Sequence, residues 1–452
     1  MLVTQAVSAM GCVQKSRVEA DQEIANFTID SRLVKRGGCF IAFKGERTDG
    51  NLYAEAAEKA GAALVIVTDE AVYAKLGGNK ALVKDALAAL KEIGAYRLRG
   101  YKGRRIAITG SVGKTSTKEL ISEVLKTRKR VYTAYGNYNN ELGVAICAAN
   151  LKPKTSWAVF EMGTNSRGEI EALSKYIKPD ICVVTGIGHA HIGRFDGIEG
   201  LAAEKLSIVN GMEKRGTLYI ADSCRKYVTR AVLDRADVKY FGTDMSSQVI
   251  LGDVNRTANG DFYFTAVLRN TPYCFKLNHI YSHFVQNSLP AIAIGMAAGL
   301  SYTDVMKGVR NFQPRDGRGK LKDMGSVKVI DDTYNAGFES VISAMTNLSE
   351  ISAERKTAFI GEMGEIEGYE EMLYFKLIKR ASELTGVDFI FVGKSFARFE
   401  KTRNIKVVPT KEEALRLVSE INEGIVLFKA SRSQKFEDFV KFMEKEKMRS
   451  AV

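Results

Sequence analysis

The stretch RRIAITGSVGKTST, residues 104–117, decides the fold at the centre of the chain. A run rich in β-branched residues ends in a turn between Gly110 and Gly113, and Lys114 and Thr115 then open a stretch with helical spacing. A strand, a glycine turn and a helix N-terminus together bind phosphate, because backbone N–H groups and the helix dipole attract an anion. In such loops the lysine reaches the β- and γ-phosphates and the hydroxyl reaches Mg²⁺. The sequence therefore predicts a nucleoside triphosphate site at Gly110, Ser111, Gly113, Lys114, Thr115 and Ser116.

The spacing of this motif is narrower than that of the usual P-loop. The usual loop has its first glycine five residues before the second, and in this chain that position is Ile108. An ordinary strand–turn–helix with a glycine-rich corner is therefore the alternative to a phosphate loop.

Length and composition indicate a globular protein of several domains. The chain has 452 residues, enough for two to four domains, with 45% hydrophobic and 26% charged residues. No apolar run approaches the ~18–20 residues of a membrane helix, and residues 1–13 lack the features of a signal peptide. The six cysteines are scattered without a C-x-x-C pair, which favours buried thiols over disulfides or a zinc site. We expect a cytoplasmic protein without a membrane partner.

The net charge of +13 raises the question of a nucleic-acid partner. The dense basic cluster at residues 126–130 has no interleaved aromatic residues and belongs to no recognised nucleic-acid motif. A solvated helix end explains the cluster, and a multiply phosphorylated substrate explains the general excess. We expect no nucleic-acid binding, and an ATPase that binds nucleic acid is the remaining alternative.

The pattern of strands and helices predicts an α/β protein of three domains, at residues 1–100, 101–312 and 313–452. The first is a small α/β unit. The second carries the phosphate loop and then alternates strands with helices, as in a mainly parallel sheet. Its pattern weakens over 216–274, where segments 239–242 and 261–268 suggest antiparallel additions. The third alternates again after the turn at 314–317, as a Rossmann-like domain does.

Two predicted strands of the central domain end in residues that bind metals. Glu161 follows the strand at 157–160, and His191 follows the strand at 181–184. Ligands of open α/β sheets gather at the carboxyl ends of strands, so both side chains belong near the phosphate loop. A carboxylate and an imidazole suit a divalent ion there. Lys205, on a predicted helix over 199–208, taken alone is expected to be an exposed helical lysine.

Several further segments, taken together, resemble the Mur ligase family, and most closely its MurF type. They are GNYNNELG at 136–143, EMGTNSRGEI at 161–170, DDTYNA at 331–336, GEMGE at 361–365 and KASRS at 429–433. In the first domain, DSR at 30–32, FIAFKG at 40–45 and DG at 49–50 resemble the family's UDP-binding domain. The similarity covers nearly the whole chain in the family's order.

The resemblance implies an ATP-dependent amide ligase of peptidoglycan precursor synthesis. Its substrates would be UDP-N-acetylmuramoyl-tripeptide and D-alanyl-D-alanine, and we expect it to act as a monomer. ATP would first phosphorylate a carboxylate to give an acyl phosphate, which the dipeptide amine then attacks. Fixed positive charge at the transferring phosphoryl group and exclusion of water would favour both steps.

The resemblance also implies a role for individual residues. Lys114 would hold the β- and γ-phosphates, Thr115 and Glu161 one Mg²⁺, and His191 with a carbamylated Lys205 a second Mg²⁺. Carbamylation turns the lysine ammonium into an anion that a cation can bind. The remaining residues would bind adenine (His283 and Asn287), reach the nucleotide from the third domain (Arg318 and Asp332), or bind the other substrates (Ser31, Arg32, Asn139, Asn140 and Asn335).

The chain departs from the family's pattern at a few positions. The departures are Asn51, Gly186, Phe284, Glu362 and Ala430, together with Gly337-Phe338 where Asn-Pro is usual. Several lie in the third domain, so the identity of the amine stays open. A Mur-type ligase for another amine or acceptor, and a non-catalytic nucleotide-binding relative, are the alternatives.

Overall fold

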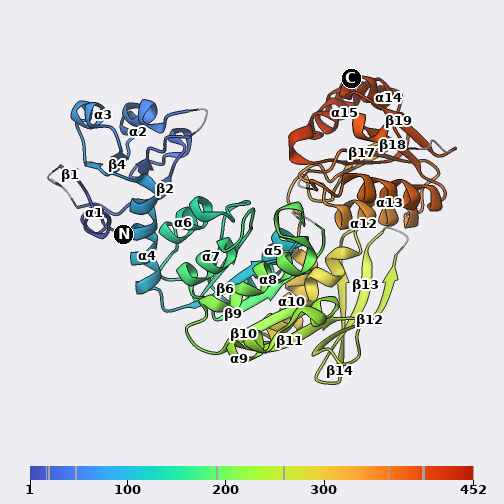
Figure 1. Ribbon diagram of the computed structural model, residues 1–452, viewed down its shortest axis with the longest axis horizontal. Coiled ribbons are helices and arrows are strands. Elements are labelled where there is room, and N and C mark those ends of the chain that lie inside the picture. Colours follow the sequence, from blue (N-terminus) through green and yellow to red (C-terminus); the bar gives the residue numbers. More distant parts are fainter. Residues whose placement is uncertain are drawn as a thin grey trace.

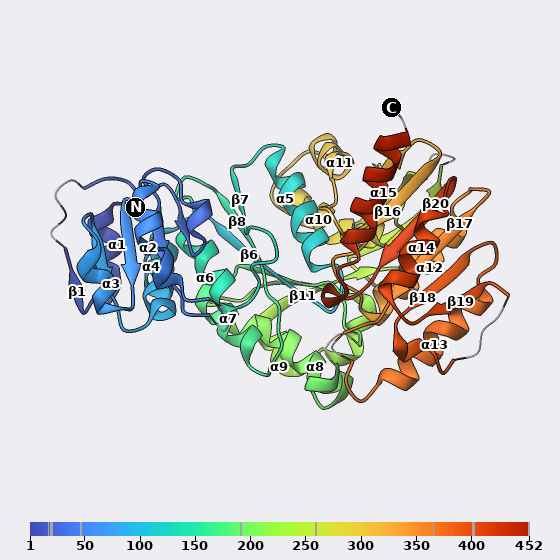
Figure 2. The ribbon, with the colours of Figure 1, turned by 90° about the horizontal axis from the view of Figure 1, so that it is seen from above.

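The computed structural model describes residues 1–450 except 17, 19, 20, 46, 47, 190, 191, 258, 259, 365 and 400–402. Figures 1 and 2 show three α/β units that follow one another along the chain, with the two termini in the outer units. Each unit has a sheet of its own, and most neighbouring strands in the three sheets are parallel. The predicted α/β class with three units is confirmed.

The first unit is built on a five-stranded sheet in the order β1-β5-β4-β3-β2. Strand β4 is buried along its whole length, as expected of a strand covered on both faces. The elements are α1 (Val3–Ala9), β1 (Gln14–Lys15), β2 (Phe27–Thr28), β3 (Cys39–Ile41), α2 (Ala54–Lys59), β4 (Leu64–Val67), α3 (Glu70–Lys75), β5 (Lys80–Leu82) and α4 (Ala86–Gly100).

Helix α4 joins this unit to the next one. Asp85 caps the helix, because its carboxylate accepts hydrogen bonds from the backbone N–H groups of Leu87 and Ala88. The first unit's buried core includes side chains of α6 (Glu141–Ala149) in the second unit. Asn150, just after α6, exchanges two hydrogen bonds of 2.9 Å with the backbone of Phe27. The first two units therefore share one packed boundary.

The second unit contains a nine-stranded sheet in the order β14-β13-β12-β11-β10-β9-β6-β8-β7. The phosphate loop follows β6, which lies between β8 and β9. Besides α6, the elements are β6 (Arg104–Thr109), α5 (Lys114–Lys126), β7 (Val131–Thr133), β8 (Trp157–Glu161), α7 (Glu169–Ile177), β9 (Ile181–Val184), α8 (Gly197–Leu206), β10 (Gly216–Ala221), α9 (Arg230–Arg235), β11 (Ala236–Gly242), β12 (Val249–Arg256), β13 (Phe262–Leu268), β14 (Thr271–Leu277), α10 (His283–Ala297) and α11 (Tyr302–Asn311).

Alternation along β6 assigns helices to the two faces of this sheet. Ile106 and Ile108 pack in one buried cluster with α5, α10 and α11, whereas Ala107 packs in another with α6 and α7. The buried clusters on both sides fix β6, and the loop that follows it, in the middle of the unit.

The prediction of antiparallel additions over 216–274 is correct for β13 and wrong for β11. Strand β13 pairs antiparallel with β12 and β14. Strand β11 pairs parallel with both β10 and β12. Helix α9, which lies between β10 and β11 along the chain, supplies the crossover that a parallel pair needs.

The third unit has a six-stranded sheet in the order β15-β16-β20-β17-β18-β19. The side chains of Phe436, Phe439, Val440 and Met443 are buried, as the helical spacing predicts. The elements are β15 (Lys320–Met324), β16 (Val327–Asp331), α12 (Phe338–Glu350), β17 (Lys356–Gly361), α13 (Glu370–Glu383), β18 (Asp388–Val392), β19 (Ile405–Val408), α14 (Lys411–Ser419), β20 (Gly424–Lys429) and α15 (Glu437–Ser450).

The helices of the described residues can be compared with the length and apolar character of a membrane-spanning helix. Among the described residues, no helix combines the length and the apolar character that a bilayer crossing requires.

Candidate functional site

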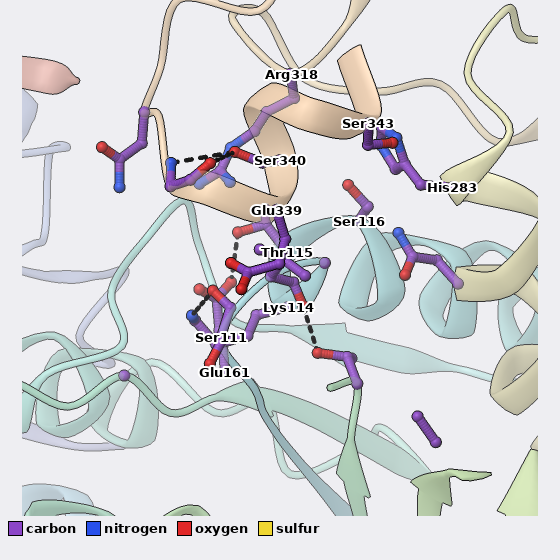
Figure 3. A pocket seen from close by; sticks show the side chains of 18 of the residues that line it. Ser111, Lys114, Thr115, Ser116, Glu161, His283, Arg318, Glu339, Ser340 and Ser343 are labelled. Carbon is purple, nitrogen blue, oxygen red and sulfur yellow. Dashed lines mark hydrogen bonds between the residues drawn. The ribbon is translucent and has the colours of Figure 1, made fainter. Parts of the chain in front are cut away.

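A cavity of about 630 Å³ lies between the second and third units. One wall is formed by the phosphate loop, the end of β8 and the start of α10. The opposite wall is formed by Arg318, Asp332 and the first turns of α12 (Figure 3). The predicted nucleotide residues of the second and third units, except Gly110, thus line one cavity.

The phosphate loop, residues 110–113, leaves β6 at the carboxyl edge of the sheet. Gly113 has φ +80°, a conformation that glycine adopts without strain. A Cβ at Gly113 would lie 2.6 Å from Oδ1 of Asn287 on α10, so the close approach also requires glycine. The ammonium of Lys114 donates a hydrogen bond of 2.6 Å to the Gly110 carbonyl. A lysine and the N-terminus of α5 therefore meet at one edge of the cavity, as a phosphate site needs.

Glu161, at the end of β8, faces the loop and is 1% exposed. Its Oε2 accepts a hydrogen bond of 2.9 Å from the hydroxyl of Thr115, and its Oε1 accepts one of 2.8 Å from Asn139. Burial opposes ionisation of Glu161, yet the positive charges of Lys118 and Lys114 outweigh burial, and the pKa of Glu161 lies below its ordinary value. The site thus presents an ionised carboxylate beside a hydroxyl.

Lys118 is a site residue that the sequence analysis missed. Its buried ammonium lies 3.6 Å from Oε2 of Glu161, 3.5 Å from Oε1 of Glu119, and donates a hydrogen bond of 2.7 Å to the Gly136 carbonyl. The available signal was its position four residues after Lys114, which places both lysines on one face of α5. Lys118 therefore holds the charge of Glu161 inside the protein.

Helix α10 contributes His283 and Asn287 to the cavity. Desolvation, with a further contribution from the charge of Lys429, lowers the pKa of His283 to about 3, so its imidazole is neutral. The amide nitrogen Nδ2 of Asn287 is buried and has no hydrogen-bond partner among the described residues. Because buried polar atoms are normally paired, this orphan donor indicates a missing ligand at the cavity.

The third unit contributes a second charged group. The carboxylate of Asp332 lies 2.7 Å from the ammonium of Lys429, which also bonds the Asn335 carbonyl at 3.1 Å. Burial raises the pKa of Asp332, and Lys429 offsets that rise only in part. Arg318 stacks its guanidinium on the ring of Tyr334 at 3.9 Å from the ring centre. The sequence analysis quoted Lys429 within a motif but gave it no role.

The two residues predicted to bind a second metal ion are His191 and Lys205. His191 lies outside the described residues. Lys205, at the end of α8, is 1% exposed, so the expectation of an exposed lysine from sequence alone is wrong. Burial, aided by the charge of Lys114, lowers the pKa of the Lys205 ammonium well below its ordinary value. Lys205 is not among the residues that line the cavity.

The candidate substrate residues fall in two places. Asn139, Asn140 and Asn335 line the cavity, and Asn140 also caps α6 through a hydrogen bond from the backbone N–H of Gly143. Ser31 and Arg32 lie in a short 3₁₀ turn of the first unit, outside the cavity, where Arg32 pairs with Asp30. The structure thus does not bring Ser31 and Arg32 to the cavity.

The departures from the family's pattern have local structural partners. Asn51 is buried, and both ends of its amide are hydrogen-bonded. Its Nδ2 donates to Asp49 and Thr68, and its Oδ1 accepts from the backbone N–H of Thr68. Phe284 packs edge-on against the rings of His279 and Phe312. Other departures are also engaged: Gly186 accepts from Ser111, Glu362 accepts from Ser395 and Gln434, and Ala430 packs against Gly361.

The arrangement suits phosphoryl chemistry. Mg²⁺ prefers oxygen ligands and keeps waters and phosphate oxygens in its shell. Thr115 and Glu161 present two such oxygens at the phosphate loop. Among the described residues, no group of three or more His, Cys, Asp or Glu side chains gathers to hold a metal by itself. Any ion here would therefore depend on phosphate oxygens as well.

Comparison with known families gives two matches along the chain. The model described as Mur ligase family, catalytic domain, matches residues 23–97. The model described as Mur ligase middle domain matches residues 108–295. Together these matches cover the first unit and the phosphate-loop unit.

Relatives over the full length include two named UDP-N-acetylmuramoyl-tripeptide–D-alanyl-D-alanine ligases. The one from Bacillus subtilis is 32% identical over 91% of this chain and 91% of its own. The one from Escherichia coli is 27% identical over 94% of this chain and 95% of its own. A crystal structure of MurF from Acinetobacter baumannii superposes with a TM-score of 0.85, at 27% identity and 98% coverage of both chains.

Proposed function

The chain belongs to the Mur ligase family, and from that premise we propose that it is a MurF-type ligase. It uses ATP to join D-alanyl-D-alanine to UDP-N-acetylmuramoyl-tripeptide in peptidoglycan precursor synthesis. The observation that carries the proposal is the single cavity in which the phosphate loop meets Glu161 from one side and the third unit from the other. In this proposal the nucleotide and the acceptor carboxylate meet at the phosphate loop, and the first turns of α12 on the opposite wall remain for the amine.

ATP is the proposed nucleotide. Its phosphates lie on the loop N–H groups and Lys114, and its base lies against His283 and Asn287 of α10. The orphan amide nitrogen of Asn287 supports this placement, since a base or ribose acceptor gives it a partner. Arg318 and Asp332 complete the nucleotide site from the third unit.

Mg²⁺ fits the oxygen donors of the phosphate loop. Thr115 and Glu161 would hold one ion, and His191 with a carbamylated Lys205 a second. When bound, Mg²⁺ neutralises charge on the transferring phosphoryl group. Burial and the lowered pKa support carbamylation of Lys205, because only an unprotonated amine adds to CO₂.

The proposed reaction has two steps, phosphorylation of the acceptor carboxylate and attack by the amine. The acceptor carboxylate attacks the γ-phosphorus of ATP, an O–P bond forms, and ADP leaves. The dipeptide ammonium first gives one proton to water, and the resulting amine attacks the acyl carbon; a C–N bond forms, the C–O bond to phosphate breaks, and inorganic phosphate leaves with the second proton of the nitrogen. Lys114 and the loop N–H groups stabilise negative charge in the first step, and closure of the second and third units over the substrates would exclude water from the acyl phosphate.

The other units and the setting complete the proposal. Ser31 and Arg32 of the first unit bind the UDP-sugar, while Asn139, Asn140 and Asn335 contact substrate within the cavity. The six cysteines are free thiols, which supports a reducing, cytoplasmic setting. One chain supplies every proposed residue, so a monomer suffices, and neither nucleic acid nor membrane takes part.

Phosphate release from ATP tests the proposal. With both proposed substrates present we expect steady turnover; without D-alanyl-D-alanine we expect at most one ADP per enzyme. Turnover with the same acceptor but another amine would keep the mechanism and change the specificity. Absence of turnover with every acceptor would overturn the assignment and favour a non-catalytic nucleotide-binding protein.

The carbamate on Lys205 has a test of its own. Activity should fall in CO₂-depleted buffer and return when bicarbonate is added. The Lys205→Ala variant should be inactive in both buffers, whereas Lys175→Ala, which changes an exposed lysine of α7, should behave as the parent. Equal parent activity in both buffers would overturn the carbamate.

A further inference from the structure

Glu339, in the first turn of α12, has one engaged and one unused carboxylate oxygen. Oε1 accepts a hydrogen bond of 2.8 Å from the backbone N–H of His189 and lies 2.5 Å from Nδ1 of the same residue. Oε2 is buried and has no hydrogen-bond partner among the described residues. An unpaired buried carboxylate oxygen is costly, so its persistence requires an explanation.

The first oxygen is held in place from the second unit. A Cβ at Gly188 would lie 2.6 Å from Cδ of Glu339, so the carboxylate packs closely against the backbone of the second unit at this point. The ring of Phe338 packs edge-on against His189 at 5.6 Å between ring centres. Gly337-Phe338 is also where the chain departs from the family's pattern. Glu339 is therefore held against the second unit by its hydrogen bond to the backbone of His189, by its close approach to Gly188 and by the neighbouring contact of Phe338 with His189.

The residue that carries the unused oxygen lines the cavity of the proposed reaction. Glu339 lines that cavity together with Lys114, Thr115 and Glu161. Figure 3 shows Glu339 on the side of α12 that faces Ser111, Lys114 and Thr115. A negative oxygen at this position repels phosphate and attracts a cation. The dipeptide brings a terminal ammonium to the reaction, and the nitrogen of that group is the atom that has to reach the acyl carbon.

We propose that Oε2 of Glu339 binds the ammonium of the incoming amine and aims its nitrogen at the acyl carbon. The inference rests on the proposed function, because it presumes an amine substrate in this cavity. Glu339 is thereby a specificity-determining residue: it selects an amine over a neutral analogue of the same shape. The charge-assisted hydrogen bond also gives the orphan oxygen its partner.

The test compares steady-state constants of the parent with those of Glu339→Gln, which keeps the shape and removes the charge. We expect the KM for D-alanyl-D-alanine to rise about ten- to one-hundredfold, as for loss of a hydrogen bond to a charged group. The KM for ATP should stay within about twofold. Glu339→Asp, which keeps the charge on a shorter side chain, should recover part of the loss.

A neutral analogue sharpens the test. D-lactyl-D-alanine has a hydroxyl in place of the ammonium, and its inhibition constant should be nearly the same in the parent and in Glu339→Gln. The matched control is Glu350→Gln, at the other end of α12, where the exposed carboxylate pairs with Arg256. Far-UV circular dichroism verifies that each variant is folded, because the single tryptophan, Trp157, lies in the second unit and α12 in the third.

Three outcomes separate the possibilities. An unchanged dipeptide KM in folded Glu339→Gln would overturn the assignment of Glu339. A parallel rise in the Mg²⁺ concentration at half-activity would overturn it in favour of a cation ligand. If the parent enzyme itself turns over with no dipeptide, the proposed function fails instead, irrespective of the variant.

Discussion

Two carboxylates face the cavity from opposite walls, and they differ in how far their partners are already in place. Glu161, on the second unit, is 1% exposed and has Thr115, Asn139 and Lys118 around its two oxygens. Glu339, on the third unit, has partners on one oxygen and none on the other among the described residues. The second unit is thus organised for phosphate chemistry before substrate arrives, whereas the third unit is completed by its ligand.

The difference follows from how each wall is built. Glu161 ends a buried parallel strand next to β6, so the sheet itself fixes its distance to the phosphate loop. Glu339 lies in the first turn of a helix of another unit, and its hydrogen-bond partner in the second unit, among the described residues, is His189. The position of Glu161 is therefore set when the second unit folds by itself. The position of Glu339 is set only when the second and third units pack together.

The largest effect should come from the phosphate loop. Lys114→Ala should lower kcat for phosphate release about 10³–10⁵-fold, because the lysine neutralises the transferring phosphoryl group. Phosphate release under saturating substrates measures it, with the exposed Lys126→Ala as the control. A loss below tenfold would place the reaction elsewhere and remove the basis of the comparison.

The next largest effect should come from removing the charge of Lys118 beside Glu161. Lys118→Met leaves the buried charge of Glu161 without its nearest cation, which should cost about 3–5 kcal/mol of folding free energy. Glu339→Gln keeps an oxygen that can accept from the backbone N–H of His189, so it should change the folding free energy by no more than about 1.5 kcal/mol. Urea unfolding followed by far-UV circular dichroism, together with the fluorescence of Trp157 at the start of β8, measures both. Equal stability of the two variants would show that the walls do not differ in this way.

The pH dependence of stability tests the burial of His283, which lies in the second unit near Lys429 of the third. His283 has its pKa lowered from 6.5 to about 3 in the folded protein. Below pH 6.5 the unfolded chain takes up a proton that the folded chain does not, so this contribution to stability is present above pH 6.5 and is lost as pH falls toward 3.

Between pH 7 and pH 5 the loss amounts to about 2 kcal/mol. The His283→Gln variant lacks this titration. Between pH 7 and pH 5 its unfolding free energy should therefore fall by about 2 kcal/mol less than that of the parent. Urea unfolding at pH 7, 6 and 5 provides the measurement. Parallel curves for the two proteins would mean that His283 titrates normally.

The smallest effect on stability is expected in the first unit. The Arg32 side chain is 86% exposed in its pair with Asp30, and exposed pairs contribute about 0–1 kcal/mol. Arg32→Ala should therefore leave the unfolding midpoint nearly unchanged while raising the KM for the UDP-acceptor about tenfold. The neighbouring Lys35→Ala serves as control. An equal rise in the KM for ATP would contradict a separate acceptor site.

The sequence permitted prediction of the site wherever local pattern and sheet geometry suffice. The phosphate loop follows from a strand, two glycines and a helix start, and Glu161 follows from its place at a strand end. The three α/β units follow from alternating strands and helices. These features depend on neighbours close in the chain or on the general rule that strand ends gather.

Other features required contacts between distant residues. Glu339 meets His189 across 150 positions of sequence, and no local pattern at either residue indicates that pair. Lys205 and Lys118 have sequences typical of exposed helical lysines, and only packing buries them. The pairing of β11 was mispredicted because α9 was not recognised as a crossover helix.

The central claim is that the second unit performs phosphoryl transfer and the third supplies the amine. Exchange of labelled ADP into ATP, with UDP-N-acetylmuramoyl-tripeptide present and no dipeptide, tests this division most directly. The account predicts exchange that requires the acceptor, vanishes in Lys114→Ala and persists at the parent rate in Glu339→Gln. Loss of exchange in folded Glu339→Gln, or exchange that needs the dipeptide, would contradict it.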